Sequence, residues 1–457
     1  MHWMIAAPRC SEFNRPRDSR KMSFFKRLFG FFSGPKTEAE AETPVAPVKP
    51  PPAKQPEGAS LVFIGWGEMV DGQSKISGYL LRPRSLAADR PIEAAALRQA
   101  LEREQVARFA EQRLVIIPLT PAYWQAADFR SLIKRRSCFL LNDLATLEPT
   151  ERATLIAEIR SAGARVAIDL RLDTDLSLAG LADVLIFDFQ TASLAALEKT
   201  VRTLRQSKPG LLMAADNVHT WAEHRLCLSL GFDFCLGSFA ATRDEEAPAA
   251  PISESRLVVI EMLNQLRSDV DLSELASTAM RDPAVVIKLL DMANSPLYGL
   301  PRKVANLEEA IMLLGRDAVY RWLALALLHV DSNSGRDQTL MVFALCRASF
   351  LKLVAGEADK QKSDEMFLVG LLSIIESLLG LPMNQILEKM RLPESVSAAL
   401  LRSEGPYARP LQLALALERC RLDQAIVLAT SIQISPTELL DYYREAMTWA
   451  TAEVGNG

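Results

Sequence analysis

Acidic residues stand at the ends of several short apolar runs, where they could take part in chemistry. Asp143, Asp169, Asp188 and Asp216 each end or follow a run that has the composition of a buried strand. If these strands are parallel, their carboxyl ends meet at one edge of the sheet, where barrel enzymes keep their catalytic groups. Converging carboxylates can hold divalent cations and activate a water molecule. These residues could therefore hold one cation weakly.

Other patterns that support chemistry are missing from the sequence. Four histidines and six cysteines are scattered without an H-x-x-x-H, a His–Asp doublet or a C-x-x-C pair. A histidine-based metal centre, a zinc site and a disulfide framework are therefore not expected. Gly65-Trp66-Gly67 is not followed by the G-K-[ST] of a phosphate loop. The formal charge of −4 argues against a nucleic-acid footprint over the whole chain. We expect no cofactor, and a cytoplasmic protein with reduced thiols.

The strands and the segments between them predict a barrel. Residues 61 to about 240 hold eight apolar runs, most of them separated by amphipathic helical segments, which is the rhythm of a parallel sheet closed on itself. Asp71-Gly72 predicts a hairpin, so the first two strands should be antiparallel. The stretch from Leu170 to Asp183 is too short for a full helical crossover. At about 180 residues this is a trimmed TIM-like (β/α) barrel, an α/β fold. The eight runs are 61–70, 76–83, 113–120, 138–143, 165–170, 184–189, 210–216 and 232–239.

The remaining segments divide the chain into further regions. Residues 1–60 form a tail and a Pro-rich linker, in which Met22 is a candidate start. Within the tail, Met22–Phe32 is basic and aromatic, which is open to two interpretations: a weak membrane or partner contact, or a disordered tail with a sticky patch. Residues 61–243 form the barrel, 244–251 a second linker and 252–457 an all-helical domain. We expect the two domains to fold as separate units.

Cap residues mark helix starts in the helical domain. Asp282-Pro283 and Asn306 each precede a helical stripe of apolar residues. Met280 and Met292 lie on apolar helical faces, and we expect both in the core. No apolar run approaches the roughly 20 residues that a membrane span needs.

The helical domain resembles the HDOD domain, a relative of HD-type phosphohydrolases. The similarity is carried by LSELASTAMRDPAVVIKLLDMANSPLYGLPRKVANLEEAIMLLG at residues 272–315. An HD hydrolase needs a His–Asp doublet, and Ser373-Ile374 occupies the corresponding position. His329 lies within an apolar helix and is interpreted as structural. The resemblance therefore implies a domain without the hydrolase metal centre.

The barrel resembles the EAL domain, which in active members hydrolyses cyclic di-GMP with two metal ions. The family opens with Glu-Ala-Leu-Leu-Arg, and the corresponding residues here run from Gly78 to Arg82, so the metal-binding Glu is replaced by glycine and Arg82 is retained. A metal-binding Asn and the next Glu correspond to Pro118 and Asn142. The resemblance implies that most of the metal-binding set is missing.

The later motifs of the family are also altered. Asp-Asp-Phe-Gly becomes Asp169-Leu170-Arg171-Leu172, which keeps one of two carboxylates. The Lys of Lys-Ile-Asp corresponds to Ile186, although Asp188 persists. Glu-x-Val-Glu reads from Asp216 to His219, and the Gln before Gly is Leu236. With these groups lost, the resemblance implies a degenerate site that cannot assemble the two-metal clamp.

Three functions remain open after this comparison. The leading one is a non-catalytic bacterial signal-transduction adaptor that acts on other proteins. The second is a cyclic di-GMP receptor that binds without hydrolysis through Arg82. The third is a weak cyclic di-GMP phosphodiesterase.

A loop in the helical domain is the candidate surface for protein partners. Asn294, Tyr298, Arg302 and Lys303 place polar and aromatic groups between two capped helices. The alternative for Asn294 and Tyr298 is that they only close the helix turn.

Overall fold

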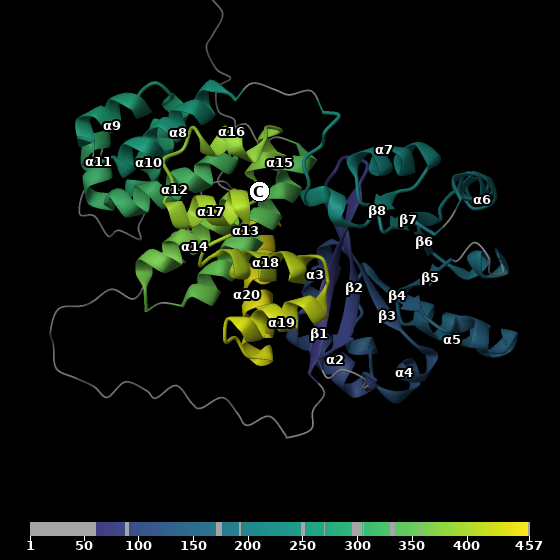
Figure 1. The fold of residues 1–457 in the computed structure, drawn as a ribbon. Helices are drawn as coiled ribbons and strands as arrows, with labels where there is room; N and C mark the ends of the chain where they lie inside the picture. The colour runs from purple at the N-terminus through teal and green to yellow at the C-terminus, as the bar shows by residue number, and fades with distance from the viewer. Residues whose placement is uncertain are drawn as a thin grey trace, which may run out of the picture.

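The structure, a computed structural model, shows a closed barrel followed by a helical lobe (Figure 1). It describes residues 61–86, 91–170, 176–191, 193–247, 252–268, 270–294, 304, 306–329, 334–356 and 358–455. The tail with Met22–Phe32 and the loop residues Tyr298, Arg302 and Lys303 lie outside the described residues.

Eight strands close the barrel in sequence order, and each lies in one of the eight predicted runs. Every neighbouring pair from β2 to β8 is parallel, whereas β1 runs antiparallel to both β2 and β8. The predicted trimmed barrel is thereby confirmed. The strands are β1 (Val62–Asp71), β2 (Ile76–Ser85), β3 (Leu114–Leu119), β4 (Ser137–Leu141), β5 (Arg165–Asp169), β6 (Val184–Asp188), β7 (Leu212–Asp216) and β8 (Phe234–Cys235).

The antiparallel start arises from the turn between β1 and β2. The Asp71 carboxylate accepts hydrogen bonds from the backbone N–H groups of Gln73 and Lys75, at 2.9 and 3.0 Å. Ser74 takes a positive φ of 60° in this turn. The hairpin predicted from Asp71-Gly72 is therefore confirmed.

Helices and short helical turns connect the strands. Between β5 and β6 the described residues hold only a 3-10 segment, η3, which agrees with the predicted short crossover. The connecting elements are α2 (Ala94–Arg103), α3 (Val106–Gln112), α4 (Pro121–Ala126), η1 (Arg130–Leu132), η2 (Leu144–Thr146), α5 (Pro149–Ser161), η3 (Leu176–Leu181), α6 (Leu194–Ser207), α7 (Trp221–Leu230) and η4 (Ser238–Ala241).

Two helices of the helical lobe begin where the cap residues predict. Asp282 accepts from the Val285 N–H at the start of α10, and Asn306 accepts from the Glu308 N–H at 2.8 Å at the start of α11. The helices are α8 (Glu254–Arg267), α9 (Leu272–Ala279), α10 (Pro283–Ala293), α11 (Leu307–Leu314), α12 (Arg316–His329), α13 (Gly335–Ala355), α14 (Lys360–Leu372), α15 (Ile375–Leu379), α16 (Met383–Leu387), α17 (Glu394–Arg402), α18 (Ala408–Glu418), α19 (Leu422–Ser431) and α20 (Pro436–Gly455).

One helix of the described part, α13, is long and apolar enough to cross a membrane. However, 67% of its apolar stretch is buried inside the fold, and all residues from Thr339 to Leu351 are buried. A helix that is apolar all round is expected at the centre of a large core. The structure uses α13 as a core helix, surrounded by α14, α18 and α20.

The N-terminus of α13 contacts the β1–β2 hairpin. Thr339 Oγ1 accepts from the Ile76 N–H at 3.1 Å and donates to the Ser74 carbonyl at 2.9 Å. Gly335 lies so close to the hairpin that an added Cβ would be 2.3 Å from the Gln73 carbonyl oxygen. Glycine is therefore needed at the start of this helix, and the hairpin is held by both side chain and backbone.

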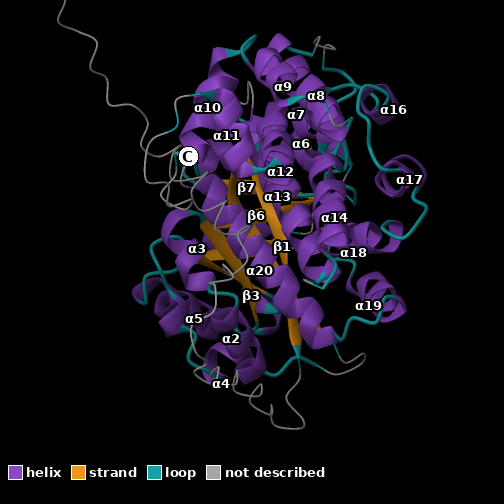
Figure 2. Cartoon of the chain, turned by 90° about the vertical axis from the view of Figure 1, so that its left-hand side faces the viewer, coloured by secondary structure: helices purple, strands orange, loops and turns teal. Residues whose placement is uncertain are grey.

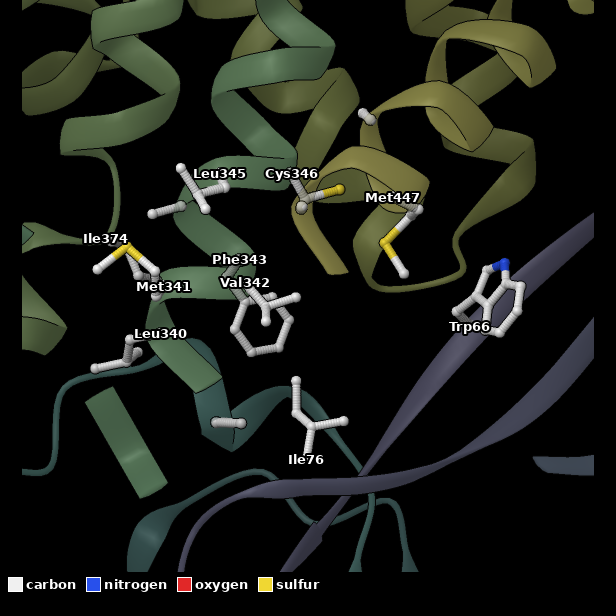
Figure 3. Packing of buried hydrophobic residues seen from close by; sticks show 14 of the residues in the cluster. Trp66, Ile76, Leu340, Met341, Val342, Phe343, Leu345, Cys346, Ile374 and Met447 are labelled. Carbon is white, nitrogen blue, oxygen red and sulfur yellow. The ribbon is translucent and has the colours of Figure 1, made fainter. Parts of the chain in front are cut away.

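Apolar side chains from both halves form one core. The largest cluster of buried hydrophobic residues in the described part contains residues of the barrel and of the helical lobe. Figure 3 shows Trp66 and Ile76, from the first two strands, among residues of α13 and Met447 of α20. The Phe63 and Tyr443 rings lie 5.7 Å apart across the same boundary. In Figure 2, α13 and α20 lie in front of the barrel strands. The division into two separately folding units stays a prediction, because a contact between the halves does not decide whether each folds alone.

Charged groups are also buried at this boundary. The Arg347 guanidinium donates to both carboxylate oxygens of Glu418, at 2.7 and 2.8 Å, and the two side chains are 5% and 13% exposed. Glu68 of β1 lines the same small cavity as this pair. Burial first, and then the charge of Glu418, raise the pKa of Glu68 to about 8. Near neutral pH this carboxyl is therefore mostly protonated, because ionising it would place a second negative charge in a dry contact.

Stability should fall as the pH rises from about 5 to about 8. The pKa of Glu68 is higher in the folded state than in the unfolded state, so folding holds a proton on this carboxyl. Below the unfolded pKa the carboxyl is protonated in both states, and its pKa shift costs no stability. Between the unfolded and the folded pKa the free energy of unfolding falls as the pH rises. Glu68→Gln removes the group, and we expect a shallower decline and a gain of about 2 kcal/mol in unfolding free energy at pH 8. Chemical denaturation at pH 5, 6.5 and 8 measures the free energy of unfolding of both proteins.

The control is Glu102→Gln, which removes an exposed carboxylate on α2. An identical decline with pH in the wild type and in Glu68→Gln would contradict this account of the boundary.

Candidate functional site

The candidate site is the mouth of the barrel, where the parallel strands end. Along each strand, side chains that point into the barrel alternate with side chains that face the surrounding helices, as the period of a strand requires. Below the mouth the barrel is filled by a separate apolar cluster that includes Leu80, Ile116, Leu140, Ile186 and Leu236. The barrel is thus a packed core, and chemistry is possible only at its ends.

Arg82 and Asp216 form the central polar pair of the mouth. Arg82 Nη2 donates to both carboxylate oxygens of Asp216 at 2.7 Å each, and the side chains are 34% and 13% exposed. Burial acts to lower the pKa of Arg82, but the charge of Asp216 and its hydrogen bond leave that pKa raised overall. The retained arginine is therefore already neutralised by a carboxylate of the same barrel.

The other acidic positions lie on neighbouring strand ends. Asp169 ends β5 and is exposed, while Asp188 ends β6 and is half-buried. Asp188 and Asp216 are direct register partners on β6 and β7, and Asp188 accepts from the Gln190 N–H at 3.0 Å. Among the described residues, no three His, Cys, Asp or Glu side chains are grouped so that they could hold a metal ion.

Three positions of the mouth, Pro118, Ile186 and Leu236, carry side chains without a ligand atom for a cation. Pro118 is half-buried in β3, and Ile186 is buried in the apolar cluster, 3% exposed. Leu236 follows β8 and is 1% exposed within the same cluster. Asn142 follows β4 and is exposed, with its backbone N–H bonded to the Leu119 carbonyl.

His219 and Gly237 belong to the loops after β7 and β8. The exposed His219 lies 3.4 Å from the Ser238 hydroxyl, and its backbone N–H donates to Glu223 at 2.6 Å. Gly237 takes a φ of 148°, and a Cβ there would be 1.9 Å from the Val218 carbonyl oxygen. This close approach explains the glycine, which the sequence alone did not single out for a structural role.

Gly78 is not brought to the mouth. It pairs with Leu114, the first residue of β3, and lies four residues before Arg82 on β2. At about 3.3 Å per residue, Gly78 is therefore about 13 Å further toward the opposite end of the barrel. A Cβ at this position would be 2.6 Å from the Leu114 carbonyl oxygen, so no larger side chain fits there without a backbone shift.

The helical lobe reaches the mouth beside the Arg82–Asp216 pair. Cys420, between α18 and α19, lies against Gly65, where an added Cβ would be 2.6 Å from its sulfur. Gly65 is the register partner of Arg82 on β1. Burial raises the pKa of Cys420 to about 12, with a smaller contribution from Glu68, so this thiol stays protonated. Sequence reasoning missed this contact because it joins residues far apart in the chain.

Ser373, which stands where an HD hydrolase has its His–Asp doublet, makes structural hydrogen bonds. Ser373 ends α14, where its hydroxyl donates to the Gly370 carbonyl at 2.7 Å and accepts from Arg347 at 3.0 Å. Arg347 is the residue that binds Glu418 at the domain boundary. Ser373 therefore supports the buried ion pair.

The interaction loop is described only at its two ends. Asn294 is half-buried, its amide donates to the Leu290 and Val304 carbonyls, and its oxygen accepts from the Val304 N–H at 2.6 Å. Asn294 thus closes the base of the loop, as the alternative interpretation predicted. Met280, expected in the core, is 63% exposed, so that expectation was wrong: the residue ends α9 at the surface.

Residues 251–397 match the family model of the HDOD domain. This part of the chain is an HDOD domain, and the predicted order of a barrel followed by an HDOD domain is confirmed.

Two curated bacterial proteins are similar in sequence to the chain. The uncharacterized protein YuxH of Bacillus subtilis is 26% identical over 284 residues, which cover 61% of this chain and 68% of that protein. The cyclic di-GMP phosphodiesterase CdgJ of Vibrio cholerae is 26% identical over 201 residues, which cover 44% of this chain and 46% of CdgJ. The chain therefore matches less than half the length of CdgJ.

Solved structures of EAL proteins are also among the matches. BlrP1 of Klebsiella pneumoniae, in complex with calcium and cy-diGMP, is 17% identical with a TM-score of 0.31, over 39% of this chain and 54% of that one.

Proposed function

We propose that this chain is a non-catalytic signal-transduction adaptor, in which a degenerate EAL-like barrel and an HDOD domain act together on other proteins. The observation that carries the proposal is the Arg82–Asp216 pair at the mouth. The arginine that the EAL resemblance would assign to a phosphate is bound by a carboxylate, and the neighbouring positions hold Pro118, Asn142 and Ile186. Two-metal hydrolysis needs several acidic ligands at these strand ends. Pro118 and Ile186 supply no ligand atom, and Asn142 supplies a neutral amide oxygen in place of a carboxylate.

The fold supports an adaptor by joining the two parts. Cys420 meets Gly65 at the mouth, and α13 holds the hairpin at the opposite end of the same two strands. The helical lobe therefore contacts β1 and β2 at both of their ends, so a structural change at either end can reach it. This is the kind of connection that lets a binding event in one part bias the other. We place the protein in the cytoplasm of a bacterium.

A surface for a protein partner lies on α9, α10 and α11. Four large apolar side chains are exposed there: Met280 at 63%, Ile287 at 59%, Met312 at 68% and Leu313 at 46%. The three helices contact one another, and the loop after Asn294 joins two of them. Large exposed apolar groups on neighbouring helices are typical of protein-binding surfaces, and methionine adapts well to a partner.

The second candidate function is a receptor that binds cyclic di-GMP without cleaving it. Arg82 favours it, because its side chain remains 34% exposed at the mouth and its guanidinium could exchange Asp216 for a phosphate. The similarity to CdgJ points to the same ligand. A weak phosphodiesterase is the third and least supported candidate.

Purified protein should not produce linear product from cyclic di-GMP above background with Mg²⁺ or Mn²⁺. Chromatography of the reaction mixture measures this, and calorimetric titration with and without the metals measures binding. Binding without cleavage, lost in Arg82→Ala and kept in the matched control Arg84→Ala, would establish the receptor. Arg84 lies on the same strand but is exposed. Metal-dependent product that disappears in Asp169→Ala would contradict both non-catalytic functions.

The partner surface can be tested on the folded chain. A Met280→Glu, Met312→Glu double variant should lose the proteins that the wild type retains from its native host, because charges on an apolar contact must be desolvated. Quantitative mass spectrometry of the retained proteins measures this, after circular dichroism has shown equal folding. Val427→Glu is the control, since Val427 is 70% exposed on α19, outside these helices. Identical partner sets for all three proteins would remove this surface from the proposal.

A further inference from the structure

A cavity of 310 Å³ lies between the two parts of the chain, at the end of the barrel opposite the mouth. We call it the basal cavity. Its barrel wall comes from the starts of β2, β3 and β4, represented by Ser77, Arg113 and Arg136. Its other wall comes from α13 and α20, represented by Gln338 and Val454. The cavity therefore exists only when barrel and helical lobe are docked.

The charge of the basal cavity is one-sided. Lys75, Arg113 and Arg136 line it, and the described residues of its wall include no carboxylate. The chain as a whole has a formal charge of −4, so this local excess of cations is not a general property of its surface. Gln112 and Gln338 add neutral hydrogen-bonding groups, whereas the Ser77 hydroxyl already donates to the carboxylate of Asp71 behind the wall. Several cationic residues lining one cavity, together with neutral donors, are the chemistry that binds a small anion.

Part of this wall is fixed in place. Arg113 Nη1 donates to the Tyr79 hydroxyl at 2.8 Å, and its guanidinium carbon lies 5.8 Å from the centre of the Tyr79 ring. Tyr79 is fully buried, so it cannot follow the arginine into solvent. The backbone N–H of Lys75 is held by Asp71, and that of the next residue by Thr339. An anion would therefore meet one guanidinium, that of Arg113, whose position is already restricted, which lowers the entropy lost on binding.

The positive surface continues beyond the basal cavity. A smaller cavity of 70 Å³ shares Gln112 and Arg113 with it and runs between α3 and α20. This extension adds Arg108, and the described residues of its wall again include no carboxylate. Arg136, the last residue of the exposed basic run from Lys134 to Arg136, is thus the one member of that run that lines this wider cationic groove.

We propose that the basal cavity is a binding site for a small phosphate-bearing anion that bridges the barrel and the helical lobe. The volume lies at the lower end of the range for small-molecule sites, which suits a pyrophosphate or a mononucleotide. Because both walls are needed, the anion binds the docked arrangement and stabilises it in proportion to its occupancy. This site is separate from the mouth, which lies at the other end of the barrel, and does not depend on the adaptor proposal.

Isothermal titration of the full chain with pyrophosphate tests the site, with inorganic phosphate and AMP as parallel probes. We expect saturable binding with one site per chain. Arg136→Gln and Lys75→Gln should each weaken it about tenfold, because each removes a charge-assisted hydrogen bond. Arg135→Gln is the matched control: it removes the same charge from the neighbouring exposed residue, which does not line the cavity. Arg82→Ala should leave pyrophosphate binding unchanged, which separates this site from the mouth.

The outcomes decide the proposal and the kind of ligand. Tighter binding of AMP than of pyrophosphate assigns a nucleotide, and the reverse order assigns an inorganic phosphate compound. Equal weakening in Arg135→Gln and Arg136→Gln would show only general attraction to positive charge and would overturn the site. Absence of saturable binding for all three probes at low ionic strength, where attraction is least screened, would overturn it as well.

Discussion

Docking of the first two strands onto α13 and α20 is the contact on which the rest of the structure depends. β1 closes the barrel by pairing with β2 and β8. The same strand contacts the helical lobe through Phe63, Gly65 and Glu68. The barrel and the domain boundary therefore share one element. Burial of apolar area provides the main free energy of this contact, while the hydrogen bonds of Thr339 to Ser74 and Ile76 fix its register.

In the proposed adaptor, this shared element gives the barrel a role that needs no chemistry. In the EAL resemblance the mouth is a place where ligands bind and react. In this chain Arg82 is present at the mouth, where the Asp216 carboxylate binds its guanidinium. Cys420 of the helical lobe lies beside this pair. At the other end, the hairpin that continues the same strands is held by α13. A barrel whose first two strands contact the helical lobe at both ends fits the proposed adaptor, in which the barrel binds rather than cleaves.

Local features of the fold could be predicted from the sequence, because they depend on neighbouring residues. Alternating apolar runs gave all eight strands, Asp71-Gly72 gave the hairpin, and Asp282 and Asn306 gave two helix starts. Contacts between distant residues could not be predicted in this way. Thr339 meets Ile76 across 263 positions of the chain, and no periodicity records such a pairing. The sequence expectation of two separate units had the same origin, because a change of pattern marks a boundary but does not reveal what packs across it.

The candidate site was predicted in its residue types and only partly in its geometry. Asp188, Asp216 and Arg82 lie at strand ends as the resemblance implied. Gly78 does not, because the register of β2 against β3 places it near the other end of the barrel. The exposure of Met280 was missed for a similar reason: helical spacing identifies an apolar face, but not whether another helix covers it.

Cutting the linker between the two parts tests most directly whether they form one unit. A protease site placed between Ala247 and Ile252 would allow the folded chain to be cleaved without touching the core. We predict that the cleaved protein elutes from a sizing column at the position of the uncut chain and that both fragments unfold in a single transition. Two fragments that separate without denaturant, each retaining its own folded spectrum, would contradict the account.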